Sequence, residues 1–251
     1  MTCQAISQLC RALAAGAVLC MSARGQNIPP GTAVPIQIKT GLNAEADSGG
    51  KKIVGRVMQD VPLPNGGKIK EKSSITGHVV RVSKPGSSGS SMVVSFDAIE
   101  NDGHETHIAA SLLAVASYVE ISEAQSPVNS TANMDSTSQW TTRQVGGDVV
   151  RRGWGKAGSA GGVMGKWIKG SAVVIRLTPD PEAGCPGGGP GYEIEQAVWV
   201  FSSAACGAYG LPNLTIAHSG ATSPVGQIEL KSTKNLVIRS GSGWLLMIGG
   251  E

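Results

Sequence analysis

Short stretches in which apolar residues alternate with others recur along this chain, and they constrain its fold more than any other feature. Val34, Ile36 and Ile38 form the first, a pattern that indicates a strand with one buried face. Turns rich in Gly, Pro, Asn and Ser separate such stretches, for example at residues 62–67 and 84–91. Further candidate strands span residues 53–61, 75–82, 92–99, 173–177, 197–202, 214–217, 227–230, 236–239 and 244–248. Because convincing helices are few, we expect a mainly β fold with two β-sandwich- or barrel-like units.

The composition is that of a chain with a hydrophobic core, and it argues against a disordered chain, a nucleic-acid-binding protein and a protein with a membrane-spanning helix. Hydrophobic residues make up 41% of the 251 residues, so wholesale disorder is excluded. Aromatic residues make up only 4%, so Val, Ile, Leu and Ala must build most of the core. The net charge of +3 is too small to argue for nucleic-acid binding. No apolar run in the sequence reaches the roughly 18–20 residues of a membrane-spanning helix.

The first 25 residues have the pattern of a secretory signal peptide. Arg11 supplies a basic start, residues 12–21 form a short apolar run, and Ala23 and Gly25 precede a cleavage site after Gly25. Cleavage after Ala23 and a buried N-terminal helix are the alternatives. The sequence therefore predicts an exported protein, periplasmic or extracellular, with no transmembrane helix once the signal is removed.

The cysteines agree with export. Three of the five lie in the predicted signal peptide, and the remainder of the chain keeps only Cys185 and Cys206. An even pair in an exported protein indicates a disulfide. It would close a loop of about 20 residues and stabilise the fold by roughly 3 kcal/mol. Two free buried thiols are the alternative.

Composition shifts divide the chain into four parts. We expect a signal peptide over residues 1–25, an N-terminal β domain over 26–122, a polar linker and Gly-rich connector over 123–169, and a C-terminal β domain over 170–251. Within the connector, residues 153–165 are dense in glycine, which favours a short helix or a turn-rich segment. Whether the two β units form one domain or two stays open.

One internal repeat joins the two β units. Residues 31–38 align without gaps to residues 170–177, and most positions carry identical or chemically similar residues. In each copy a glycine precedes an alternating stretch. The repeat predicts two equivalent strands, and chance similarity between two ordinary strands is the alternative.

The N-terminal β unit resembles a known family. Residues 28–35 (IPPGTAVP) resemble the I-P-x-G-T-x-(I/V)-P strand of the VirB10/TrbI-like β-barrel domain of conjugation and type IV secretion channels. Residues 55–61 and 75–79 resemble later strands of that domain, so the resemblance covers about residues 28–120. It implies a β-barrel in the cell envelope, with other envelope proteins as partners. Residues 69–73 depart from the family's I-P-x-G-(S/T) motif, and the whole chain resembles exported bacterial proteins of unknown function, which implies no activity.

Three motifs that could carry chemistry each fail in a specific way. Residues 47–50 (DSGG) resemble the nucleophile turn of trypsin-like proteases, but Ala46 replaces the preceding glycine and every histidine lies downstream. Residues 153–158 match G-x-G-x-x-G without a surrounding βαβ unit. His104 and His107 would point to opposite faces of a strand and could not share a metal. We therefore expect no catalytic site, no cofactor and no metal.

Two surface features offer binding roles. Lysines at positions 51, 52, 68, 70 and 72 could contact an acidic glycan or lipid, or simply line a solvated sheet edge. Tryptophans are prominent in a chain with so few aromatics, and they could pack the core or contact a ligand or partner: Trp154, Trp167, Trp199 and Trp244.

The sequence thus predicts an exported cell-envelope structural or interaction module rather than an enzyme. A carbohydrate- or peptide-binding module that uses exposed tryptophans is the alternative, and a hydrolase with an unrecognised site is a remote one. Envelope proteins or cell-wall glycan are the expected partners, and the oligomeric state stays open.

Overall fold

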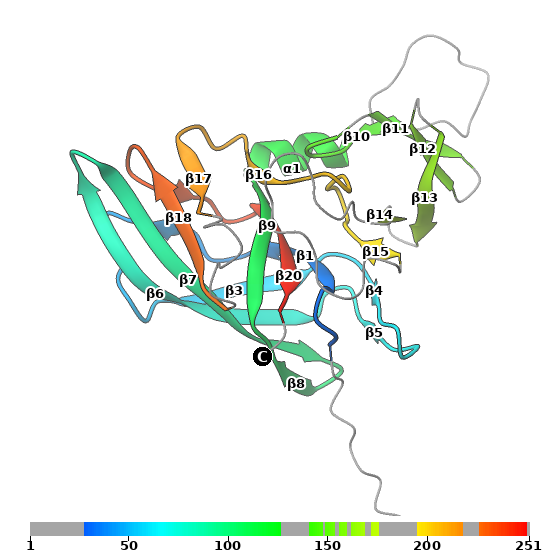
Figure 1. Ribbon diagram of the computed structural model, residues 1–251, viewed down its shortest axis with the longest axis horizontal. Helices are drawn as coiled ribbons and strands as arrows, with labels where there is room; N and C mark the ends of the chain where they lie inside the picture. Colours follow the sequence, from blue (N-terminus) through cyan, green and yellow to red (C-terminus); the bar gives the residue numbers. More distant parts are fainter. Residues whose placement is uncertain are drawn as a thin grey trace, which may run out of the picture.

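The computed structural model describes residues 28–126, 141–147, 149–153, 156–159, 162–168, 172–175, 195–217 and 226–249. Strands dominate these residues, as Figure 1 shows, so the predicted mainly β fold is confirmed. The predicted signal peptide lies outside the described residues, and so do Cys185 and Trp154. No helix in the described ranges is long and apolar enough to cross a membrane.

A large mixed sheet forms the body of the molecule (Figure 1). Its strands lie in the order β16-β9-β20-β1-β3-β6-β7-β18-β17, and β8 adds to β7 outside this order. The pairing is antiparallel except between β16 and β9, which run parallel. The strands are β1 (Ala33–Ile38), β3 (Lys52–Val57), β6 (Ser74–Gly86), β7 (Gly89–Asn101), β8 (His104–His107), β9 (Ala110–Ala116), β16 (Gly207–Tyr209), β17 (Leu214–Ile216), β18 (Ile228–Ser232) and β20 (Gly243–Ile248).

Three smaller sheets and one helix complete the described structure. A six-stranded sheet stands to the right of the body in Figure 1 and follows chain order: β10 (Thr141–Arg143), β11 (Val149–Gly153), β12 (Lys156–Ser159), β13 (Gly162–Ile168), β14 (Ala172–Ile175) and β15 (Gln196–Ala197). Two pairs of short strands are β2 (Leu42–Asn43) with β19 (Val237–Ile238), and β4 (Val61–Pro62) with β5 (Lys68–Ile69). The helix α1 (Tyr118–Gln125) follows β9.

The large sheet curls around one hydrophobic core. Side chains from β1, β3, β6, β7, β9, β18 and β20 belong to the same buried cluster, although β16 and β17 at its two ends do not pair. Within it, the rings of Phe96 and Trp244 meet edge to face, with centroids 5.6 Å apart. Gly77 permits the close approach of β6 and β7, because a Cβ there would lie 2.1 Å from the Ser95 carbonyl oxygen. The described strands therefore form a curled, open sheet.

The strand β20 is buried on both faces. Trp244 and Leu246 belong to the core inside the curl, whereas Leu245 and Met247 belong to a second cluster on the other side. That second cluster includes Ile121 of α1 and the segment 198–201. Burial on both faces explains why residues 244–248 (WLLMI) are continuously apolar rather than alternating.

The observed organisation differs from the expected domain boundaries. β18 pairs with β7, and β20 lies between β1 and β9, so the C-terminal residues 226–249 and the N-terminal region share one sheet. The expected C-terminal β domain over residues 170–251 is divided between this sheet and the six-stranded one. The reason is that β20 needs neighbours that cover both of its apolar faces and both of its backbone edges, and β1 and β9 supply the edges.

The glycine-rich connector is also different from the expectation. Residues 153–165 contribute to β11, β12 and β13 rather than to a helix. Strand pairing relies on backbone hydrogen bonds, so Gly and Ala can pair without the apolar alternation that reveals a strand in a sequence.

Both copies of the internal repeat form strands, as predicted, but the two strands do not occupy equivalent places in the fold. Residues 33–38 form β1 and residues 172–175 form β14, whereas Gly170 lies outside the described residues. β1 lies in the middle of the large sheet, between β20 and β3, and β14 lies between β13 and β15 of the other sheet.

Candidate functional site

A groove of about 660 Å³ opens at one end of the curled sheet. The start of α1, the β16–β17 connection and β19 form its walls, and α1, β16 and β17 lie together at the top of Figure 1. Three large hydrophobic side chains of the described chain are exposed: Tyr118 is 54% exposed, Val119 58% and Val237 46%. All three line this groove. Exposed apolar side chains that gather at one hollow mark a binding surface rather than ordinary surface variation.

One wall is the first turn of α1, which the local sequence places firmly. Ser117 caps the helix, because its Oγ accepts a hydrogen bond from the backbone N–H of Glu120. The backbone N–H of Ser117 donates to the carbonyl of Tyr209, which ties the cap to β16. Gly210 packs so closely that a Cβ would lie 2.5 Å from the Ser117 Oγ, and its φ of 61° also favours glycine. Tyr118 is therefore held at the mouth of the groove.

The opposite wall is β19, whose backbone has an open edge. The partner of Val237 in β2 is Asn43, but the Asn43 N–H donates to Asp47 Oδ2 and its carbonyl accepts from Ala46 and Asp47. In an antiparallel pair without mutual hydrogen bonds, the N–H and C=O groups point away from the partner strand. The backbone of Val237 therefore turns away from β2, and within the described residues it has no hydrogen-bond partner. This open edge borders the groove, because Val237 lines it.

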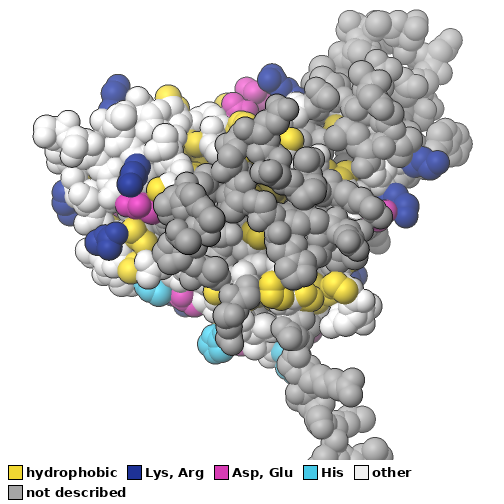
Figure 2. Space-filling view, in the orientation of Figure 1, with side chains coloured by type: hydrophobic (Ala, Val, Ile, Leu, Met, Phe, Trp, Pro, Cys, Tyr) yellow, Lys and Arg dark blue, Asp and Glu magenta, His cyan; other side chains and the backbone are white. Residues whose placement is uncertain are grey.

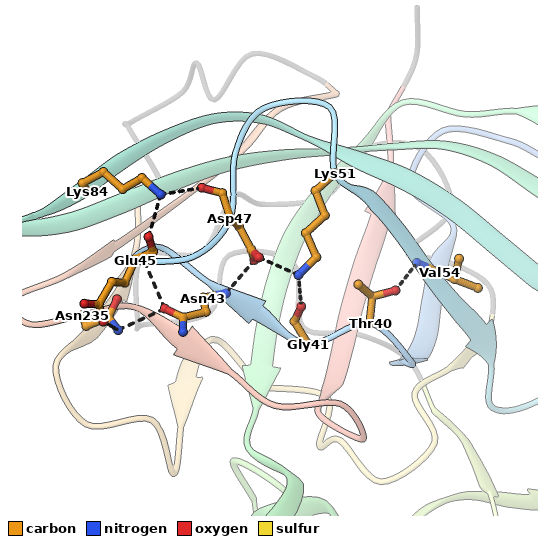
Figure 3. Close-up of polar contacts among 9 residues, drawn as sticks. All are labelled: Thr40, Gly41, Asn43, Glu45, Asp47, Lys51, Val54, Lys84 and Asn235. Atoms are coloured by element: carbon orange, nitrogen blue, oxygen red, sulfur yellow. Dashed lines mark hydrogen bonds and ion pairs between the residues drawn. The ribbon is translucent and has the colours of Figure 1, made fainter.

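A polar cluster next to the groove supports β2 and β19, and Figure 3 shows its hydrogen bonds and ion pair. Lys51 Nζ lies 2.7 Å from Asp47 Oδ1 and 2.7 Å from the carbonyl oxygen of Gly41. Lys84 Nζ donates to the carbonyl oxygen of Asp47 at 2.8 Å. Asn235, which lines the groove, donates from Nδ2 to Asn43 Oδ1 at 3.0 Å. These contacts hold the wall of the groove in place.

The same cluster shows what the Asp47-Ser48-Gly49-Gly50 turn does. Asp47 is nearly buried, and its two carboxylate oxygens bind Lys51 and the N–H of Asn43. The carboxylate of Asp47 therefore organises this turn.

The predicted tryptophan contacts are corrected for two of the four residues. Trp199 is 5% exposed and Trp244 is 0% exposed, so both pack in the core and neither can stack on a ligand. Trp244 is buried because β20 is covered on both faces, and Trp199 lies against Gly243 and the second apolar cluster. Trp167 lies in β13, but its side chain is outside the described residues, as is the whole of Trp154.

The other candidates from the sequence are the cysteine pair and the histidines of β8. Cys206 donates its backbone N–H to the Tyr209 hydroxyl, and its pairing with Cys185 stays a prediction because Cys185 lies outside the described residues. The Nε2 of His107 lies 3.9 Å from the Oε1 of Glu105, and both side chains are highly exposed on β8. Among the described residues, no group of three or more His, Cys, Asp or Glu side chains is placed to hold a metal ion.

Three of the five lysines in the predicted basic group are paired with carboxylates. Lys51, Lys68 and Lys70 form ion pairs with Asp47, Asp60 and Asp102, at 2.7, 2.5 and 2.6 Å respectively. On the face shown in Figure 2, Lys and Arg side chains are scattered rather than gathered. These ion pairs favour the interpretation of the lysines as a solvated sheet edge over a free basic patch.

The sequence reasoning missed the groove residues. Ser117 followed by Glu120 is a helix-start signal that could have revealed α1. Nothing local in the sequence brings Val119 and Val237 together, because they meet only through the tertiary fold.

Comparison of the chain with protein-family models, with curated proteins and with solved structures finds no match in any of the three. The resemblance of residues 28–120 to the VirB10/TrbI-like domain therefore stays a prediction.

Proposed function

We propose that this chain is a non-enzymatic, exported interaction module that binds an extended segment of a partner protein in the groove at the open end of its large sheet. One observation carries this proposal: the exposed large hydrophobic side chains of the described chain, Tyr118, Val119 and Val237, all line that groove. Burying these side chains against a partner would be favourable by the usual hydrophobic effect.

The open edge of β19 favours a peptide over a glycan as the ligand. An extended peptide can pair with the free N–H and C=O of Val237 while its side chains enter the groove, which is a common mode of peptide recognition. Sugar binding would instead need exposed aromatic faces, and Trp199 and Trp244 are buried. Tyr118 alone supplies an exposed ring among the groove residues.

The test is peptide selection with the exported form of the full chain, starting after Gly25. A displayed library of random peptides is selected on the immobilised protein, and selected peptides are titrated in solution. We expect extended, apolar-rich sequences whose affinity falls at least about tenfold when Tyr118→Ser and Val119→Ser are combined. Both positions are exposed, so these changes should leave the fold intact.

A matched control separates the groove from general stickiness. Val80→Ser removes a partly exposed valine from β6, away from the groove, and should leave peptide binding unchanged. Equal loss of binding in both variants would refute a groove-specific site. A panel of cell-wall glycans and hydrolase substrates run in parallel would reveal the alternatives, since saturable glycan binding or turnover contradicts the proposal.

Export is tested separately. N-terminal sequencing of the protein recovered from its native source should give a chain that begins at Gln26, or at Arg24 if cleavage follows Ala23. A protein that retains Met1 inside the cell would contradict export without bearing on peptide binding.

A further inference from the structure

A second hollow, of about 450 Å³, adjoins the groove. Glu120 and Gly210 line both, so the two spaces meet at the first turn of α1 and the end of β16. The groove is bordered by exposed apolar side chains, whereas the adjoining hollow is bordered by Glu120, Glu123 and Gln144. A ligand that lies along the groove can therefore reach a polar hollow with one side chain.

The hollow has an excess of negative charge. Glu120 and Glu123 are three residues apart in α1, which places them on the same face of the helix. The described structure gives neither carboxylate an ion-pair partner. Glu120 does not close a capping box, because the Ser117 N–H donates to Tyr209 instead. The exposed Arg143 also lines the hollow and leaves one negative charge uncompensated.

A buried acceptor points to the same ligand chemistry. Gln144, which lines this hollow, is 4% exposed. Its Nε2 donates to the carbonyl oxygen of Phe201 at 3.2 Å, which orients the amide, and its Oε1 is buried without a hydrogen-bond partner. A buried acceptor in this state is costly, so a hydrogen-bond donor brought by a ligand would be favoured there.

We propose that the adjoining hollow takes a basic side chain, lysine above all, from the same partner segment whose apolar residues occupy the groove. An ammonium group carries three donors, the hollow offers the carboxylates of Glu120 and Glu123, and Gln144, whose Oε1 has no hydrogen-bond partner, lies in its wall. Charge-assisted hydrogen bonds are about twice as strong as neutral ones, so this contact would select among apolar segments. The inference rests on the proposed peptide-binding function and adds the chemistry that selects the partner.

The test uses three fluorescently labelled synthetic peptides with the same central run of Leu, Val and Ile residues. Each carries Lys, Gln or Glu at its two ends, so that either binding direction presents the test residue to the hollow. Fluorescence anisotropy measures their affinity for the full exported chain. We expect the Lys peptide to bind about tenfold more tightly than the Gln peptide, and the Glu peptide to bind most weakly.

Matched variants assign the preference to the hollow. Glu120→Gln combined with Glu123→Gln keeps the size and helix propensity of both residues and should abolish the preference for the Lys peptide over the Gln peptide. Glu105→Gln, on the exposed strand β8 at the far end of the molecule (Figure 1), should change nothing. Raised salt should reduce the preference for Lys.

The outcomes separate this inference from the proposed function. Equal binding of the three peptides, or a Lys preference that survives the double variant, overturns the basic-residue proposal and keeps the groove as a peptide site. Absence of binding by all three peptides, together with failure of the library selection, overturns both.

Discussion

Gln59 and Trp199, which are 140 residues apart in the chain, are joined by a buried hydrogen bond of 2.6 Å from the backbone N–H of Trp199 to the Gln59 Oε1. Trp199 has a φ of 52°, an uncommon conformation for a residue with a side chain. A second buried glutamine makes a similar long-range hydrogen bond: Gln196 Oε1 accepts from the backbone N–H of Ala33 at 3.0 Å. These two side chains attach the segment around β15 to the large sheet.

Replacing Gln59 should therefore loosen this attachment. Gln59→Leu leaves the Trp199 N–H buried without its acceptor, and we expect the free energy of unfolding to fall by about 1–3 kcal/mol. Urea denaturation of the two proteins measures the difference. Gln37→Leu is the control, because Gln37 is only partly buried and water can replace its bond to Gly241. If Gln59→Leu and Gln37→Leu lower the free energy of unfolding equally, the buried hydrogen bond to Trp199 contributes no more than the partly buried one of Gln37.

Lys72 is a position where glycine should be better than the natural residue. Its backbone has a φ of 73° and its side chain is exposed, so a Cβ contributes strain and little packing. Removing strain of about 1–2 kcal/mol outweighs the greater unfolded-state entropy of glycine, and Lys72→Gly should stabilise the fold by up to about 1 kcal/mol. Lys72→Ala keeps the Cβ and should bring no gain. A thermal melt in which both variants behave alike would contradict the strain argument.

Asp60 should make stability depend on pH in the acid range. Burial acts to raise the pKa of Asp60, but hydrogen bonds from Lys68 and the Glu71 backbone N–H outweigh it and hold the pKa below its usual value. A lowered pKa in the folded state contributes stability that is present above the unfolded-state pKa and is lost as the pH falls through the folded value. Asp60→Asn should thus be less stable than the natural protein at about pH 7, and the difference should shrink below about pH 4.

Urea denaturation across this pH range checks the Asp60 prediction, with Glu105→Gln on the exposed strand β8 as the control. A stability difference between Asp60→Asn and the natural protein that stays constant into acid would show that the charge of Asp60 is not its source.

The Cys185–Cys206 disulfide stays a sequence-based prediction that mass spectrometry can check. Proteolysis without reduction should yield one cross-linked peptide pair, and the double variant Cys185→Ser with Cys206→Ser should lose roughly 3 kcal/mol of stability. Each single variant should lose at least as much as the double variant, because it also leaves an unpaired thiol. Finding both cysteines alkylated without prior reduction would refute the pairing.

Local sequence accounts for much of the β structure. Alternation at Ile36 and its neighbours predicts β1, and the turn at residues 84–91 agrees with the sharp return between β6 and β7. It does not account for the strands of the glycine-rich segment, whose pairing leaves no apolar pattern. It also missed α1, because the cap at Ser117 is followed by Tyr118 and Val119, residues that favour strands.

By itself, the sequence determined that this chain forms short strands around an aliphatic core, because side-chain alternation and turn residues act over a few neighbouring positions. Only the tertiary structure decided that β20 completes the N-terminal sheet, that two tryptophans are buried, and that Tyr118 and Val237 meet across one groove. Strand partners are selected by which faces and edges of distant segments fit together, and that selection is a property of the assembled sheet rather than of any local pattern.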